Sequence, residues 1–292
     1  TDVLRSPAYR EALAPFDTVI LTLSDNSGRQ YEPDWTRAGY HDLAAYLLRA
    51  YRGTGKTFVL GLWETDHWLP LDQKGLAYLR ARQEGIASAR SEIGQDRVRV
   101  LGMVEVTKAD GDCVATKLLS QATPEVLSLS WWRYQDSLAE ALGKLKALVP
   151  GATLMVGELG LSNRRREPDR PARLLAAIDA ARRAGAEWVI QWKLDDWEFG
   201  LVDDRLSGGW PTDLWYALWP LFHGGAGLEP ASWQPWAGGL RAAARLADGR
   251  LTLRLPDASG LVDVVAFATD GGATDIAAAL RHVGARLRHG GR

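Results

Sequence analysis

The stretch KTFVLGLWETDHWLP, residues 56–70, joins a strand pattern to a cluster of polar and aromatic residues. Its first half, KTFVLGL, is an apolar run rich in β-forming residues, and it predicts a buried strand. Directly after this run comes a cluster of two indoles, two carboxylates and an imidazole: Trp63, Glu64, Asp66, His67 and Trp68. What this cluster does depends on what lies at the ends of the other strands.

Similar apolar runs recur along the chain and alternate with amphipathic helical patterns. Strands are predicted over 16–24, 56–63, 97–106, 125–132, 152–160 and 186–194, and helices over 39–53, 74–94, 136–149, 169–185 and 211–222. The strand runs are continuously apolar, which is typical of strands buried on both faces of a parallel sheet. This βα alternation predicts either a (β/α) barrel or a doubly wound sheet. No glycine-rich phosphate loop follows any of the strands, so nucleotide binding has no support.

The bulk composition excludes several classes of partner. The net charge of −1 gives no electrostatic basis for binding nucleic acid or an anionic membrane. No run approaches the roughly 18 apolar residues of a membrane span. The single cysteine, Cys113, excludes an internal disulfide. The compartment stays open, since a secreted or periplasmic location is compatible with a signal peptide that has been removed. Oligomeric state is not predicted.

Carboxylates and aromatic residues stand where the predicted strands end. Glu64, Glu105 and Glu158 end three of them, and aromatic or acidic residues follow others: Trp132, Tyr134, Trp192 and Asp195. In a parallel barrel these ends share one face, which carries the active site. A lone strand-end carboxylate is usually a surface residue. Glu158 differs because it lies between two glycines, in GELG, inside a buried run, and glycines let other groups approach closely.

Paired carboxylates beside aromatic platforms are what glycoside hydrolysis requires. One carboxyl group protonates the leaving oxygen, and the other attacks the anomeric carbon or activates water. The 13 tryptophans against 5 phenylalanines fit this chemistry, because indoles offer flat faces to sugar rings, although core packing also explains them. The predicted substrate-binding residues are Trp63, Asp66, His67, Trp68, Glu105, Trp132, Tyr134, Trp192 and Asp195. No cofactor or metal is expected, since His67 has no second histidine nearby in sequence.

The motifs FVLGLWE, LMVGELG and VIQW resemble the clan A retaining glycoside hydrolases, (β/α)8 enzymes that include families 5 and 39. The resemblance covers roughly residues 5–223 and implies an acid/base at Glu64 and a nucleophile at Glu158. It also implies a sugar-binding floor at Trp192 and places Tyr134 beside the nucleophile. The expected substrate is a β-linked oligo- or polysaccharide. The two carboxyl groups are then expected about 5–5.5 Å apart.

Two departures from this family pattern are visible. The family has Asn directly before its acid/base, and this chain has Trp63 there. Counting backwards makes 16–24 the third strand, so strands 1 and 2 have no obvious sequence. The sequence therefore predicts a TIM-type (β/α)8 barrel over residues 1–223, without its first strands. Residues 224–292 are predicted to form a small C-terminal extension, either separate from the main sheet or completing it.

Two other functions remain open. A barrel that binds carbohydrate without turnover would be consistent with Trp63 replacing Asn. A barrel enzyme of another class could use Glu105 and Lys108 for proton abstraction.

Overall fold

The computed structural model describes residues 2–24, 27–132, 138–162, 170–193, 198–203, 210–212, 214, 218, 234–236, 239–246, 249–254 and 264–266. The chain divides into two compact units. The first comprises Thr1–Glu158 with Ala184–Val189, and the second comprises Leu159–Arg183 with Ile190–Arg292. The boundary between residues 223 and 224 stays a prediction.

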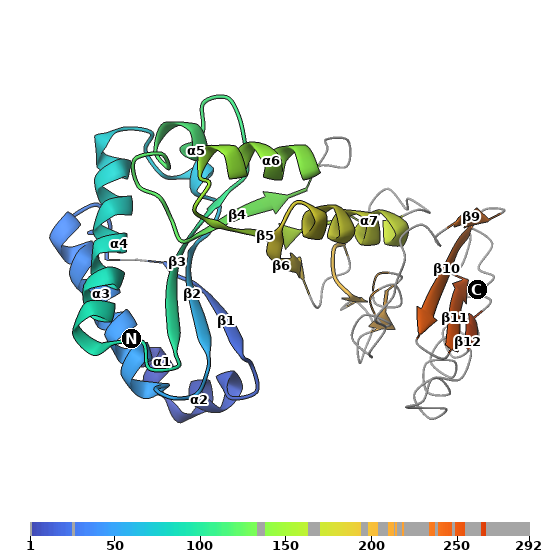
Figure 1. The fold of residues 1–292 in the computed structure, drawn as a ribbon, viewed down its shortest axis with the longest axis horizontal. Coiled ribbons are helices and arrows are strands. Elements are labelled where there is room, and N and C mark those ends of the chain that lie inside the picture. Colours follow the sequence, from blue (N-terminus) through green and yellow to red (C-terminus); the bar gives the residue numbers. More distant parts are fainter. Residues whose placement is uncertain are drawn as a thin grey trace. The chain divides into compact units, whose positions relative to one another are not determined.

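The main sheet has six strands in the order β1-β2-β3-β4-β5-β6. They are β1 Thr18–Thr22, β2 Thr57–Leu62, β3 Arg99–Val106, β4 Val126–Trp131, β5 Thr153–Leu159 and β6 Ala186–Gln191. All six predicted strands are confirmed. The strands are parallel and alternate with helices, and their spatial order follows the chain order (Figure 1). A doubly wound sheet would reverse direction at a switch point, so this winding is that of a (β/α) barrel. Among the described residues the barrel is incomplete.

Helices of the first unit cover this sheet and build its core. They are α1 Asp2–Arg5, α2 Pro7–Leu13, α3 Pro33–Ala50, η1 Thr65–His67, α4 Gln73–Ile93, α5 Val114–Lys117 and α6 Leu138–Leu148. Helices α3 and α4 pack against each other and against β3 (Figure 1). One cluster of apolar side chains, including Leu47, Phe58, Ile86 and Val100, is buried between them and the strands. Burial of this apolar surface is the main force that holds the helices on the sheet.

Helix α4 shows why the elements begin and end where they do. The Asp72 carboxylate accepts hydrogen bonds from the backbone N–H groups of Lys74 and Gly75, and so caps the first turn. At the other end Gly94 has φ +79° and ψ 166°, a positive-φ conformation that glycine adopts readily, and the helix stops there. The helix thereby returns the chain to β3 with the carboxyl end of that strand beside the carboxyl end of β2.

The second unit holds α7 Arg170–Arg183 and several short strands. The strands are β7 Val202–Asp203, β8 Trp210–Pro211, β9 Gln234–Trp236, β10 Gly239–Leu246, β11 Gly249–Arg254 and β12 Val264–Ala266. Strands β9–β12 form their own antiparallel sheet, so these residues do not complete the main sheet. The helix predicted to begin at Pro211 does not begin there, because Pro211 pairs with Val202 in a short hairpin. No helix in the described parts of the chain is long and apolar enough to cross a membrane.

Candidate active site

Glu64 is positioned by a sharp turn at the end of β2. Its backbone has φ 41° and ψ 55°, a left-handed conformation that is uncommon for a residue with a side chain. The turn leads into η1, where the buried Thr65 hydroxyl donates a 2.7 Å hydrogen bond to the Glu105 carbonyl oxygen. This bond ties the turn to the end of β3. The Glu64 side chain remains 14% exposed, which leaves it open to a ligand.

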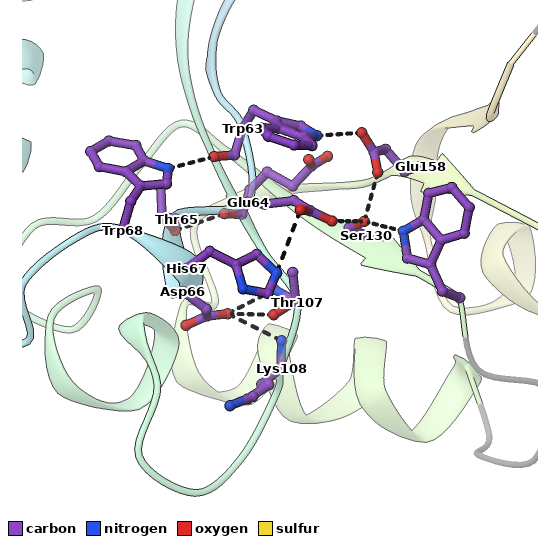
Figure 2. Close-up of polar contacts among 12 residues, drawn as sticks. Trp63, Glu64, Thr65, Asp66, His67, Trp68, Thr107, Lys108, Ser130 and Glu158 are labelled. Atoms are coloured by element: carbon purple, nitrogen blue, oxygen red, sulfur yellow. Dashed lines mark hydrogen bonds and ion pairs between the residues drawn. The ribbon is translucent and has the colours of Figure 1, made fainter. Parts of the chain in front are cut away.

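A serine on β4 brings two of the predicted carboxylates together. Ser130 Oγ lies 3.0 Å from Glu64 Oε1 and 3.0 Å from Glu158 Oε2 (Figure 2). The indole Nε1 of Trp132 donates a 2.7 Å hydrogen bond to the same hydroxyl. Trp132 lies directly after the end of β4, two residues beyond Ser130. Residues from β2, β4 and β5 therefore converge at the carboxyl ends of their strands.

Trp63 contacts the other oxygen of Glu158. Its indole Nε1 donates a short hydrogen bond to Glu158 Oε1, while its carbonyl oxygen accepts a 2.8 Å bond from Trp68 Nε1 (Figure 2). Trp63 is 47% exposed and Trp68 is 38% exposed. Each indole thus combines a fixed polar end with an open aromatic face.

A third carboxylate, Glu105, lies deeper in the sheet. It is 2% exposed and stands opposite Ser128 in the β3–β4 register. The Ser128 hydroxyl donates a 2.8 Å hydrogen bond to Glu105 Oε2. Burial raises the pKa of Glu105 to about 7, against the hydrogen bond from Ser128, and the nearby charges of Glu158 and Glu64 raise it further. Glu105 therefore carries a proton in a substantial fraction of molecules at neutral pH.

The glycine before Glu158 makes room for this carboxylate. A Cβ atom at Gly157 would lie 2.0 Å from Glu105 Oε2 and 2.3 Å from Ser128 Oγ. No side chain fits there without displacing Glu105 or Ser128. The close approach that the GELG motif predicted is therefore made at Gly157.

Glu158 itself is 3% exposed. Burial raises its pKa, and the charge of Glu64 acts in the same direction. The hydrogen bonds from Trp63, Ser130 and Trp132 oppose this change because they stabilise the ionised form.

Glycoside hydrolases appear among solved structures similar to this chain. A family 26 endo-β-1,4-mannanase from Cellulomonas fimi is 14% identical with a TM-score of 0.49, over 90% of this chain and 72% of that one. A family 5 lichenase from Caldicellulosiruptor sp. F32 is 12% identical with a TM-score of 0.45, over 69% of this chain and 68% of that one. A family 5 xyloglucanase from Paenibacillus pabuli is 12% identical with a TM-score of 0.44, over 68% of this chain and 69% of that one.

The chain is thus similar to solved glycoside hydrolases of the kind that the sequence motifs resemble. No family model and no curated protein sequence matches the chain.

Asp66 and His67 have different surroundings from the glutamates. Asp66 Oδ2 accepts hydrogen bonds from the backbone N–H groups of Thr107 at 2.7 Å and Lys108 at 3.2 Å (Figure 2). Its Oδ1 accepts one from the backbone N–H of Val114 at 2.7 Å. His67 is an exposed side chain with Nε2 3.4 Å from Glu64 Oε2. Within the described residues, no three His, Cys, Asp or Glu side chains are arranged to hold a metal ion.

The roles of three further predicted site residues stay predictions. Tyr134 and Asp195 lie outside the described residues. Trp192 belongs to the second unit, where its backbone N–H donates to the Leu159 carbonyl oxygen at 3.1 Å. Its role as a sugar-binding floor stays a prediction.

Sequence reasoning missed Ser128 and Ser130, although a signal for them exists. In LSLSWW the two hydroxyls occupy alternate positions of a strand that is otherwise apolar. Alternate positions share one face of a strand, and a buried hydroxyl needs a partner. Two serines on one face of β4 therefore indicate polar groups facing them, which are the carboxylates of Glu105, Glu64 and Glu158.

Proposed function

We propose that this chain is a retaining glycoside hydrolase that acts on a β-linked sugar, with Glu158 as nucleophile and Glu64 as acid/base. The observation that carries the proposal is the shared contact with Ser130. Because Glu64 Oε1 and Glu158 Oε2 are each 3.0 Å from Ser130 Oγ, these two oxygens lie at most 6.0 Å apart. That limit favours the retaining separation of about 5–5.5 Å over the inverting one of about 6.5–9.5 Å.

The surroundings of the two glutamates suit the two roles. Glu158 accepts the indole N–H of Trp63, and such a bond favours the ionised carboxylate that a nucleophile requires. Glu64 is more exposed, so it can reach a leaving-group oxygen, donate a proton and later take one from water. The exposed indoles of Trp63 and Trp68 are suited to stack on sugar rings.

The same indoles support a second candidate function, a barrel that binds carbohydrate without turnover. Trp63 stands where the family has its Asn, which ordinarily contacts the sugar. A proton-abstracting enzyme that uses Glu105 and Lys108 has less support. Glu105 is 2% exposed, whereas Lys108 is an exposed residue, so the two side chains are not both accessible to one substrate.

The deciding experiment compares Glu158→Gln and Glu64→Gln on activated and unactivated substrates. Glu158→Gln removes the nucleophile and should abolish turnover of every β-glycoside. Glu64→Gln should fail on an oligosaccharide but still release dinitrophenolate in the first step, because that leaving group needs little protonation. Added azide should then restore turnover by attacking the glycosyl-enzyme intermediate. Product release and azide-dependent glycosyl azide formation are measured on aryl β-glycosides and on β-glucan, mannan and xyloglucan.

A matched control is Glu125→Gln, which changes a glutamate of the same sheet at the amino end of β4, where it pairs with Arg90. This variant should keep the activity of the unmodified protein. Full activity of Glu64→Gln on an unactivated oligosaccharide would refute its role as the acid, and Glu105 would be tested next. Sugar binding without any product would favour the non-catalytic barrel, and no response to any sugar would favour another class of enzyme.

A further inference from the structure

One hydroxyl group in the site makes more contacts than its single proton can serve. Ser130 Oγ is 2.7 Å from Trp132 Nε1, 3.0 Å from Glu64 Oε1 and 3.0 Å from Glu158 Oε2 (Figure 2). A serine hydroxyl has one proton to donate and two lone pairs to accept with, while an indole N–H can only donate. Trp132 therefore occupies one lone pair, and one proton and one lone pair remain for two carboxyl groups.

The contacts of Ser130 with Glu64 and with Glu158 can both be hydrogen bonds only when one of the two carboxyl groups is protonated. If both glutamates were ionised, one of them would face the Ser130 oxygen with no proton between the two atoms. We propose that Ser130 is a positioning residue that holds a single proton within the Glu64–Glu158 pair. In this arrangement protonated Glu64 donates to Ser130, and Ser130 donates to ionised Glu158.

The neighbouring groups determine which glutamate carries the proton. The indoles of Trp63 and Trp132 and the Ser130 hydroxyl all stabilise the ionised form of Glu158. On the other oxygen of Glu64, His67 Nε2 lies at 3.4 Å. Glu105 on β3 also faces the pair, and the charges of Glu158 and Glu64 raise its pKa. These donors favour the ionised form of Glu158 and oppose the effect of burial, which raises its pKa, and on this ground we assign the proton to Glu64.

The bridge has a measurable consequence for titration. It stabilises the singly protonated pair against both the doubly protonated and the fully ionised pair. Two coupled groups with such an intermediate lose their protons in two well-separated macroscopic steps. Removing the hydroxyl should bring the two steps together, by about one pH unit for one hydrogen bond to a charged group. The catalytic value of the bridge rests on the proposed function, because a resting hydrolase needs one protonated and one ionised glutamate.

The test is a ¹³C NMR titration of protein labelled at the glutamate side-chain carboxyl carbons. Glu64→Gln and Glu158→Gln assign the two signals. In the unmodified protein the Glu64–Glu158 pair should titrate in two steps at least about two pH units apart. Ser130→Ala should narrow this interval by about one unit. Ser130→Thr, which keeps the hydroxyl, should preserve the interval.

The matched control is Ser128→Ala, which removes a hydroxyl from the same face of β4 but not from the pair. It should preserve the interval between the two steps. The proposal is overturned if Glu64 and Glu158 titrate together in the unmodified protein, or if folded Ser130→Ala keeps the full interval. The first criterion needs no Ser130 variant, so it applies even if Ser130→Ala fails to fold.

Activity provides a separate readout. The pH profile of kcat/KM should be bell-shaped and should narrow from both sides in Ser130→Ala, whereas Ser130→Thr should keep its width. A merely structural role would lower the profile without narrowing it. If the NMR interval narrows but no glycoside is hydrolysed, the proton bridge stands and the proposed function fails. If hydrolysis behaves as proposed but the pH interval between the two titration steps does not change in Ser130→Ala, the proton bridge is refuted and the proposed function stands.

Discussion

Asp66 is a residue whose contacts explain its position without any ligand. The sequence predicts that it binds substrate, and that prediction is still to be tested. Its two carboxylate oxygens accept three backbone N–H groups from the segment after β3, those of Thr107, Lys108 and Val114. Hydrogen bonds to a charged acceptor are the stronger kind. We therefore expect Asp66 to hold this segment against the turn that carries Glu64.

Replacing Asp66 tests this role. Asp66→Ala leaves three backbone donors without their acceptor and should lower the free energy of unfolding by about 2–3 kcal/mol, measured by urea denaturation. Asp112→Ala, which removes an exposed partner of Lys117 nearby, should change it little. An unfolding curve unchanged in Asp66→Ala, together with a raised KM, would instead make Asp66 a substrate-binding residue.

Strand β5 illustrates how one element is shaped by the side chains of its neighbours. Its GELG motif predicts close approach, and the structure places the approach at Gly157, facing Glu105 and Ser128. The backbone at Gly157 does not have a positive φ. The lack of space for a side chain beside Glu105 and Ser128 therefore explains the glycine at position 157.

The corresponding prediction concerns Gly157→Ala. The added methyl group must displace Glu105 or Ser128 from the buried sheet, so we expect a loss of about 1–3 kcal/mol in unfolding free energy. The loss should be smaller when Glu105→Ala is already present, because one of the two clashing groups is gone.

Gly143→Ala serves as the control. No atom lies within 4 Å of its new methyl group, so this change in helix α6 should stabilise by about 0.5–1 kcal/mol. If Gly157→Ala lowers the free energy of unfolding equally with and without Glu105→Ala, a clash with Glu105 does not explain the glycine in β5.

At the scale of the whole molecule, Glu105 links folding to pH. In the unfolded chain its pKa is near 4.5, and in the folded protein burial raises it to about 7. Between these values the folded state binds the additional proton, so stability falls as pH rises from about 4.5 to 7 and is constant beyond. Burial also raises the pKa of Glu158, which contributes with the same sign.

Glu105→Gln removes this titration from the folded protein. The unmodified chain should lose stability between pH 5 and pH 8, and the variant should lose less, by up to about 3 kcal/mol. Urea unfolding at the two pH values measures this change in unfolding free energy. The control Glu11→Gln, on the surface of α2, should show the same change as the unmodified chain. An identical pH dependence in Glu105→Gln and the unmodified chain would show that Glu105 is ionised in the folded protein already at pH 5.

The sequence alone determined the six strands, their parallel winding and the group of residues at their carboxyl ends. These features follow from local patterns: continuous apolar runs, helical periodicity and the period of two along a strand. Glu64 and Glu158 stand out in the same way, because each carboxylate directly follows or interrupts an apolar run.

How these residues contact one another depends on the tertiary structure. Ser130, on a different strand from either carboxylate, lies 3.0 Å from both Glu64 and Glu158, and Trp63 donates its indole N–H to Glu158. Gly157 owes its place to a carboxylate from β3, which is 52 residues earlier in the chain. Such contacts depend on strand register and on the turn at each strand end. Those are set by the packing of segments far apart in sequence, which no local pattern records.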